Sequence, residues 1–293
     1  IHIVVGIITK GRRELALQLA SYFHTHYGHD STVQIILIEN GSSVFQQKDF
    51  EGFSKQVMFK HINEASIPKA RNYIFNQVKN KDVKLAFIDD DCIPGDDWIE
   101  QIKNLLFDEK VVAYTGSCIS IPRKNIFAQT SQILYQLWIE ANVDKMTSIT
   151  SILDTKNVVF NTAALKGKRR LFSEQLVYAT DVELAARLID EGFVLHYYPQ
   201  MRVFHQERTT LQSFFAHRYR LSLAYRKIRS SLSLVKSVSL FRKFEVLSKN
   251  LPTHFLNRLL IIFVLLTIYF LVTCQLLINK LANFFSKARK SVL

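Results

Sequence analysis

An apolar run in the first third of the chain ends abruptly at three consecutive aspartates. Residues 83–88 are mostly apolar and are followed by Asp89, Asp90 and Asp91, and then by Pro94. This pattern predicts a buried strand with the acids at its carboxyl end. In open α/β sheets ligands bind at that edge, and clustered oxygen ligands there suit Mg²⁺ or Mn²⁺. A solvated acidic turn is the alternative. We favour a cation site, because three adjacent like charges repel each other unless a cation or hydrogen-bond donors offset them.

Apolar strands and amphipathic helices alternate through the first hundred residues. Strands are predicted at residues 1–8, 33–38, 57–62 and 83–88. Pro68 suits the first turn of the helix before the fourth strand, and Arg71 falls on that first turn. The alternation predicts an α/β protein with a mainly parallel sheet flanked by helices. No strand is followed by a glycine-rich dinucleotide or Walker motif, so phosphates must be held by a metal and by Lys or Arg side chains.

Further strands are predicted beyond the acids, at residues 111–120, 157–162 and 193–198. Between the first two lies a segment, residues 126–146, whose pattern permits either a helix or a loop. The basic stretch from Lys166 to Phe172 is interpreted as a solvated turn.

A second informative stretch begins at Thr180. Thr180 and Glu183 have the spacing of a capping box, and Gly192 fits just past the end of an amphipathic helix. Asp181 then lies in the first turn, where free backbone N–H groups and the helix dipole favour an ionised carboxylate, as a general base requires. Asp is also common in first turns for stability alone, so both interpretations stay open.

His205 follows the last predicted strand of this region. A lone histidine is more often structural or solvated than a ligand. Its place after a strand that can lie near the acids raises the second possibility, because imidazole readily completes an oxygen-rich metal site.

Positive charge is concentrated towards the end of the chain. The formal net charge is +13, and the densest basic region runs from Arg202 to Lys249, directly before an apolar segment. From Thr209 onwards basic and aromatic residues interleave, which is compatible with binding to single-stranded nucleic acid. We favour amphipathic helices at a membrane surface, because aromatic and aliphatic side chains can enter the headgroup region while the cations meet anionic lipid.

The apolar segment from Leu259 to Ile278 is twenty residues long and is bracketed by Arg258 and Lys280. It is long enough to cross a bilayer, and a buried core helix is the alternative. The concentration of basic residues before this segment predicts that the first 250 residues face the cytoplasm at an inner or plasma membrane. The tail is also basic, which permits a hairpin that re-enters or lies on the membrane.

In order and spacing, these motifs resemble family 2 glycosyltransferases of the GT-A fold. The resemblance covers residues 1–205 and rests on six stretches, which are Thr9 with Arg12, Glu39 to Ser42, Pro68 to Asn72, Phe87 to Pro94, Thr180 with Asp181, and His205. It implies a GT-A catalytic domain over residues 1–205. Basic amphipathic helices are then expected over residues 206–250, and a membrane-spanning or membrane-embedded helix with a basic tail over residues 251–293.

The resemblance also implies roles for single residues. Thr9, Arg12, Glu39 and Arg71 would bind the nucleotide, with Thr9, Glu39 and Arg71 near its base. Asp89 and Asp90 would contact the ribose and phosphates or the metal shell. Asp91 would bind Mn²⁺ or Mg²⁺ directly, with Asp89 and His205 assisting, and Asp181 would be the general base. This chain has Glu39 where the family usually has Asp.

The implied activity is metal-dependent, inverting transfer of a sugar from a nucleotide-diphosphate donor, with a UDP-sugar favoured. A lipid-linked or envelope glycan would supply the acceptor hydroxyl, as in polysaccharide biosynthesis, and nucleic acid is not an expected partner. One alternative is an enzyme that loads a sugar onto polyprenyl phosphate. Another is a non-catalytic, membrane-tethered module that binds nucleotide sugars.

Overall fold

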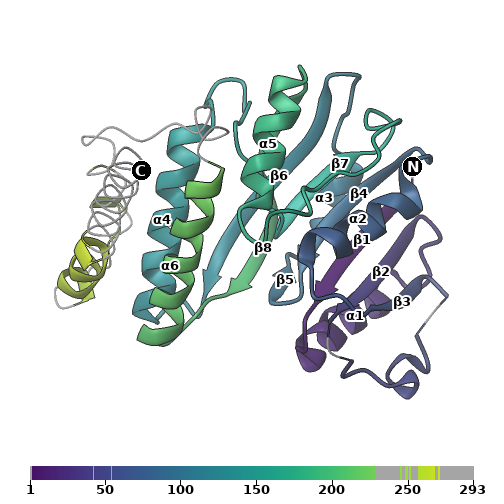
Figure 1. The fold of residues 1–293 in the computed structure, drawn as a ribbon, viewed down its shortest axis with the longest axis horizontal. Helices are drawn as coiled ribbons and strands as arrows, with labels where there is room; N and C mark the ends of the chain where they lie inside the picture. Colours follow the sequence, from purple (N-terminus) through teal and green to yellow (C-terminus); the bar gives the residue numbers. More distant parts are fainter. Residues whose placement is uncertain are drawn as a thin grey trace, which may run out of the picture.

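The computed structural model describes residues 2–41, 43–53 and 55–228, and further on residues 245, 248, 249, 251, 257–267 and 270. Eight strands form one sheet in these residues, with helices on both of its faces (Figure 1). The strands are β1 (His2–Thr9), β2 (Val33–Asn40), β3 (Val57–Ile62), β4 (Val83–Asp89), β5 (Cys92–Pro94), β6 (Val111–Ile121), β7 (Asn157–Asn161) and β8 (Val194–Gln206). The helices are α1 (Arg13–Tyr27), α2 (Ile67–Val78), α3 (Trp98–Lys103), α4 (Ile126–Asn142), α5 (Thr180–Asp190) and α6 (Leu211–Lys227), with a short 3₁₀ turn, η1 (Gln47–Phe50).

The strands are ordered β3-β2-β1-β4-β7-β6-β8-β5. The predicted parallel pairing is confirmed for β1 to β4. Beyond β4 the sheet is mixed, because β7 runs antiparallel to both β4 and β6, and β5 runs antiparallel to β8. The reversal of β7 has a consequence for the site: its first residue, Asn157, pairs with Ile88, so the turn before β7 lies at the carboxyl end of β4.

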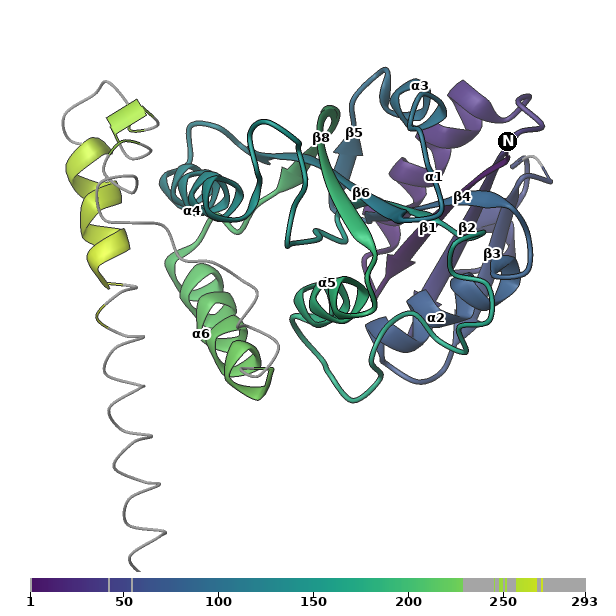
Figure 2. The same ribbon diagram turned by 90° about the horizontal axis from the view of Figure 1, so that it is seen from above.

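The sheet is apolar on both faces because helices cover both. Helices α1 and α3 pack on one face, and α2 and α5 on the other (Figure 2). Along β1, Ile3, Val5 and Ile7 belong to the first core, and Val4 and Ile8 to the second. Coverage on both sides explains why β1 is a continuous apolar run rather than an alternating one.

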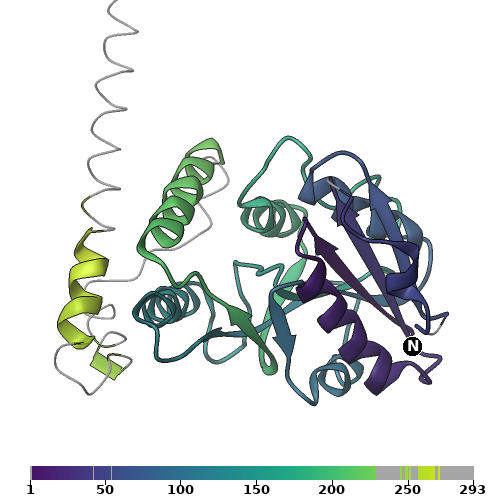
Figure 3. The same ribbon diagram turned by 90° about the horizontal axis from the view of Figure 1, so that it is seen from below.

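Helices α4 and α6 lie beside the half of the sheet that contains β6 and β8 (Figure 3). The segment left open by the sequence is largely helical, and α4 begins where the Asn125 side chain accepts hydrogen bonds from the backbone N–H groups of Phe127 and Ala128. Helix α6 contacts the start of α5 through Ala224, which packs with Ala179 and Val182. Trp138 of α4 packs against the same cluster, so both helices stand next to the part of α5 that carries Asp181.

Two local predictions around β8 and the basic stretch are corrected. Strand β8 does not stop before Pro199 but continues to Gln206. The proline is tolerated because the pairing with β6 skips from Tyr198 to Arg202, so no ladder hydrogen bond is required of it. The basic stretch is only partly a solvated turn, since Leu171 and Phe172 are fully buried.

The predicted capping box of α5 does not form. Thr180 is the first helical residue, and Ala179 before it has a left-handed φ of 57° and makes no side-chain cap. Glu183 pairs with Arg187 one turn later instead, at 2.8 Å. The predicted glycine at the other end is confirmed, because Gly192 has a φ of +88°, which favours a residue without a Cβ atom.

Much of the predicted membrane region lies outside the described residues. Helix α6 covers the first part of the predicted amphipathic region, and residues 229–244 are not described. Of the predicted span at residues 259–278, a helix over residues 257–267 and residue 270 are described, and it lies beyond α4 and α6 on the side away from the sheet (Figures 1 and 3). Within the described part of the chain, no helix is both long and apolar enough to cross a bilayer.

Candidate active site

The three aspartates lie where the chain reverses between β4 and β5. Strand β4 ends at Asp89, and β5 pairs antiparallel with the end of β8, with Cys92 opposite His205. The backbone N–H of Gln206 donates to the carbonyl oxygen of Asp91 at 2.8 Å. This return of the chain places His205 beside the acids, with its Nε2 atom 3.4 Å from Asp91 Oδ1.

Two arginines neutralise the acidic run. Arg71, near the start of α2, donates from Nη2 to Asp89 Oδ1 at 3.0 Å. Arg12, in the loop after β1, donates from Nε to Asp90 Oδ2 at 3.1 Å, and its terminal nitrogens pair with Asp90 and Asp91. Six residues predicted as site residues therefore lie together in one polar cluster, which consists of Arg12, Arg71, Asp89, Asp90, Asp91 and His205.

The three carboxyl groups differ in their tendency to ionise. Removal from water raises the pKa of Asp90 to about 7, and the nearby Arg12 offsets only part of this shift. Burial also raises the pKa of Asp89, against the influence of Arg71. Burial acts on Asp91 in the same sense, but His205 and Arg12 outweigh it and lower the pKa of this carboxyl. Asp91 is thus the one of the three acids whose surroundings favour the ionised form.

His205 is held between two carboxylates. Its Nδ1 atom is 2.9 Å from Oε1 of Glu207, a residue that the sequence analysis missed. Burial would lower the pKa of His205, but the contacts with Asp91 and Glu207 raise it to about 9. The signal for Glu207 was present in the sequence, because residues two apart in a strand face the same side.

Glu39 lies in a separate polar group. Its side chain is fully buried, and Oε1 accepts hydrogen bonds from the backbone N–H groups of Val44 and Phe45. Oε2 lies 3.0 Å from His61 Nδ1 on β3. Thr9 is opposite Glu39 in the β1–β2 register. Both residues are at the same sheet edge as the aspartates, but no contact joins Glu39 to the acidic cluster.

Asp181 lies at the start of α5, as predicted, but its electrostatic setting differs from the prediction. Its Oδ1 atom accepts a hydrogen bond from the backbone N–H of Val182 at 3.0 Å. The helix terminus does not set the pKa of Asp181, however. Burial is the largest influence, the charge of Asp154 is the next, and both raise this pKa. Lys156 and Arg71 act in the opposite sense. A carboxyl group in this setting binds a proton more readily than a free aspartate.

Asp154 and Lys156 are further members of the site that the sequence did not reveal. They belong to the turn before β7, and Lys156 Nζ is 3.0 Å from Asp154 Oδ2. Asp154 is 3% exposed. The pairing of Asn157 with Ile88 brings this turn beside Asp89. Sequence reasoning had no means of finding the pair, because it depends on the antiparallel direction of β7.

Unsatisfied polar atoms gather at this same edge. Among the described residues, six buried side-chain atoms make no regular hydrogen bond, and they are Thr9 Oγ1, Asn40 Nδ2, Arg71 Nε, Asp91 Oδ1, Asp154 Oδ2 and Arg218 Nε. Two of them have an ionic neighbour, since Asp154 Oδ2 lies 3.0 Å from Lys156 Nζ and Asp91 Oδ1 lies 3.4 Å from His205 Nε2. Buried polar groups are normally paired, so such a concentration calls for an explanation. The first five belong to strand ends, to the start of α2 or to the turn before β7. A polar ligand at the strand ends would supply hydrogen-bond partners to those of them that have no ionic neighbour.

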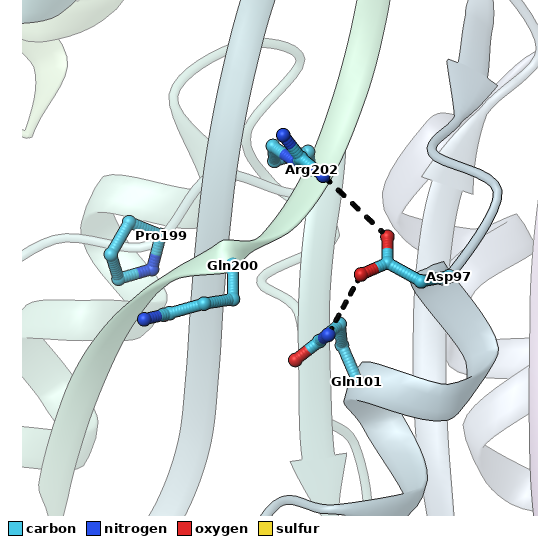
Figure 4. A pocket seen from close by; sticks show the side chains of 5 residues that line it. All are labelled: Asp97, Gln101, Pro199, Gln200 and Arg202. Atoms are coloured by element: carbon cyan, nitrogen blue, oxygen red, sulfur yellow. Dashed lines mark hydrogen bonds and ion pairs between the residues drawn. The ribbon is translucent and has the colours of Figure 1, made fainter.

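A hollow of about 340 Å³ lies elsewhere, between the start of α3 and the middle of β8 (Figure 4). It is lined by Asp97, Gln101, Pro199, Gln200 and Arg202. Asp97 accepts a hydrogen bond from Gln101 at 2.8 Å and lies 3.9 Å from Arg202, so its charge is already offset. None of the acidic cluster lines this hollow, and we do not assign the chemistry to it.

Comparisons with known proteins give a family and a fold. Residues 3–223 match the family model described as glycosyltransferase like family 2. A comparison with curated proteins finds no match. Among solved structures, the chain is similar to the mannosyltransferase PcManGT from Pyrobaculum calidifontis in complex with GDP-Man and Mn²⁺, with a TM-score of 0.58, 15% identity and coverage of 86% of this chain and 70% of that chain.

It is also similar to residues 1–349 of S. aureus TarS in complex with UDP-GlcNAc, with a TM-score of 0.58 and 13% identity. This match covers 88% of the present chain and 72% of the TarS chain. At such identities the two structures establish a common α/β fold.

Proposed function

Since the chain belongs to glycosyltransferase family 2, we propose that it transfers a sugar from a nucleotide-diphosphate donor to an acceptor hydroxyl with inversion of configuration. The observation that carries the proposal is the convergence of Asp89, Asp90 and Asp91 with two arginines and His205 at the carboxyl edge of the sheet. Asp181 is the second residue of the neighbouring helix α5. Cationic and acidic groups together suit a diphosphate, its counter-ion and a proton acceptor.

The residues present fit a divalent cation. Asp91 Oδ1 is buried, accepts no hydrogen bond and lies 3.4 Å from His205 Nε2. A carboxylate oxygen and an imidazole nitrogen are suitable ligands for Mn²⁺, and Asp89 is at the same edge. In the described part of the chain, no three His, Cys, Asp or Glu side chains are grouped to hold a metal by themselves. This agrees with a cation bound by one or two carboxylates and completed by substrate phosphates, where it would offset the charge of the leaving diphosphate.

The protein's own groups account for the remaining steps. Arg12 and Arg71 exchange their contacts with the acids for donor phosphates or ribose, and Thr9 and Glu39 lie at the adjoining strand ends for the nucleotide. Asp181 accepts the proton of the acceptor hydroxyl as it attacks the face of the anomeric carbon opposite the diphosphate. Its raised pKa suits this role, because a stronger base takes the proton more readily once ionised.

A membrane-bound acceptor is the class that we propose, either a lipid-linked or an envelope glycan. The support is the exposed apolar surface of the helix at residues 257–267, where Phe263 is 66% and Leu266 62% exposed. The basic residues before it would meet anionic lipid at the cytoplasmic face of the inner or plasma membrane. We retain a UDP-sugar as the favoured donor; PcManGT and TarS bind GDP-Man and UDP-GlcNAc respectively.

The donor class is tested by thermal unfolding of the full chain with nucleoside diphosphates and nucleotide sugars, with and without Mn²⁺. We expect stabilisation by the nucleotides of one base, and only when Mn²⁺ is present, because ligands that bind the native state raise its unfolding temperature. Asp91→Asn should remove the Mn²⁺-dependent part of the shift. An assay of donor hydrolysis or sugar transfer then distinguishes an enzyme, which turns over the nucleotide sugar, from a module that only binds it. Absence of stabilisation by every nucleotide would contradict the proposal.

A further inference from the structure

We propose that Glu207 is a positioning residue for divalent-cation binding, which acts by orienting His205 so that Nε2 faces Asp91. The inference rests on the metal dependence put forward in the proposed function. It concerns a residue outside the acidic run, at the junction between β8 and α6.

The contact between the two side chains is close and shielded from water. Glu207 Oε1 lies 2.9 Å from His205 Nδ1, and the side chains are 13% and 9% exposed. The same oxygen accepts a hydrogen bond from Ser120 Oγ on β6 at 3.2 Å. Glu207 is therefore fixed by a partner on another strand and does not simply follow the motion of His205.

The backbone around the pair is also fixed. The N–H of Gln206 donates to the carbonyl of Asp91, and the N–H of Glu207 donates to the carbonyl of Ile121, both at 2.8 Å. The first bond joins this segment to the acidic turn, and the second joins it to the end of β6. His205 and Glu207 thus have little freedom to separate while the sheet edge is intact.

The chemistry follows from the two ring nitrogens of histidine. A carboxylate can only accept, so the contact with Glu207 requires the proton on Nδ1. When a cation is bound, Nε2 is then the nitrogen with a free lone pair, and it points towards Asp91 Oδ1 at 3.4 Å. Carboxylates that hold metal-binding histidines in this way typically contribute 10-fold to 100-fold in metal affinity.

The test is titration of the full chain with Mn²⁺, monitored by the electron paramagnetic resonance signal of the free ion. We expect Glu207→Gln to weaken Mn²⁺ binding by about tenfold or more, because the amide is a poorer acceptor and no longer imposes the proton on Nδ1. Glu191→Gln is the matched control, since Glu191 forms a surface ion pair with Lys168 and should leave the affinity unchanged. Thermal unfolding of each variant verifies that it is folded.

The outcomes separate the inference from its premise. Equal Mn²⁺ affinity of Glu207→Gln and the unaltered chain would overturn the positioning role and leave the proposed function intact. No binding of Mn²⁺ by the unaltered chain, with or without uridine diphosphate, would overturn the metal dependence and the inference with it. If Glu207→Gln does not fold, Ser120→Ala removes one hydrogen bond to the same carboxylate. It should give a smaller loss of affinity, and no loss would count against the inference.

Discussion

At the scale of single residues, the site distributes its carboxyl groups between two electrostatic environments. Asp91 lies between His205 and Arg12, which outweigh burial and lower its pKa. Asp181 lacks such a direct cationic partner, and burial with the nearby Asp154 raises its pKa. One acid is therefore held as an anion and the other is a stronger proton acceptor. This division matches the separate tasks of binding a cation and accepting a proton.

We expect Asp181→Asn to lower kcat by about 10²-fold to 10⁴-fold, the usual contribution of a general base, with little change in donor binding. The raised pKa also sets the sign of the pH dependence. Because the active form is deprotonated, kcat/KM should fall as the pH drops through the raised value, which lies above that of a free aspartate.

The control for this experiment is Asp190→Asn at the exposed end of the same helix, which should leave kcat unchanged. Transfer to an isolated acceptor is followed by release of the nucleoside diphosphate across a pH series. If Asp181→Asn retained most of its activity, the alternative of a polyprenyl-phosphate acceptor would be favoured, because a phosphate needs little deprotonation.

At the scale of elements, Lys84 joins β4 to the end of α3 and the loop that follows it. Its Nζ atom donates hydrogen bonds to the carbonyl oxygens of Ile102, Lys103 and Leu105, at 2.9, 2.8 and 2.8 Å. Burial lowers the pKa of Lys84. The three hydrogen bonds to carbonyl oxygens compensate for the burial of this amine. In the sequence, a lysine within an apolar run gives no indication of this role.

We therefore expect Lys84→Met to lower the free energy of unfolding by roughly 3 kcal/mol, since it leaves buried carbonyl groups without a donor. Equilibrium urea unfolding of the full chain measures the change. Lys81→Met replaces an exposed lysine on the same approach to β4 and should change stability by no more than about 0.5 kcal/mol. Equal stabilities of the two variants would show that the three hydrogen bonds contribute little.

At the scale of the whole molecule, the covered sheet contrasts with the C-terminal helix. Both faces of the sheet are buried under helices, whereas Leu259, Phe263 and Leu266 of the helix at residues 257–267 are 47%, 66% and 62% exposed. The chain also carries a formal net charge of +13. Two features hold proteins at anionic membranes, namely exposed apolar side chains and positive charge, and this chain has both.

The full chain should consequently sediment with vesicles of phosphatidylglycerol and phosphatidylcholine more strongly than with phosphatidylcholine alone, and less so in high salt. Phe263→Asp combined with Leu266→Asp should weaken vesicle binding, because it places charge on the apolar surface. Met146→Asp is the control and should have no effect. Met146 is 96% exposed, but it is distant in the sequence from the helix at residues 257–267. Preferential binding to oligonucleotides would instead favour a nucleic-acid partner.

Several parts of the site were readable from local pattern. The sequence predicted the aspartates at the end of β4, the helix that presents Arg71, and the helix whose first turn carries Asp181. Each can be inferred from hydrophobic periodicity, or from a helix-starting or strand-ending residue a few positions away in the sequence. No contact with a distant segment is needed. The raised pKa of Asp181 could not be predicted from the sequence, because it depends on burial and on the neighbouring Asp154.

The remaining features depend on strand direction and register, which bring distant segments together. The return of β5 along β8 places His205 beside Asp91, and the antiparallel entry of β7 places Lys156 beside Asp89. The partners of Glu39 likewise come from another strand and the following loop. Local sequence therefore determined the residue types at the ends of the strands. Only the long-range packing decided which of them meet, because pairing energy depends on contacts between segments far apart in the chain.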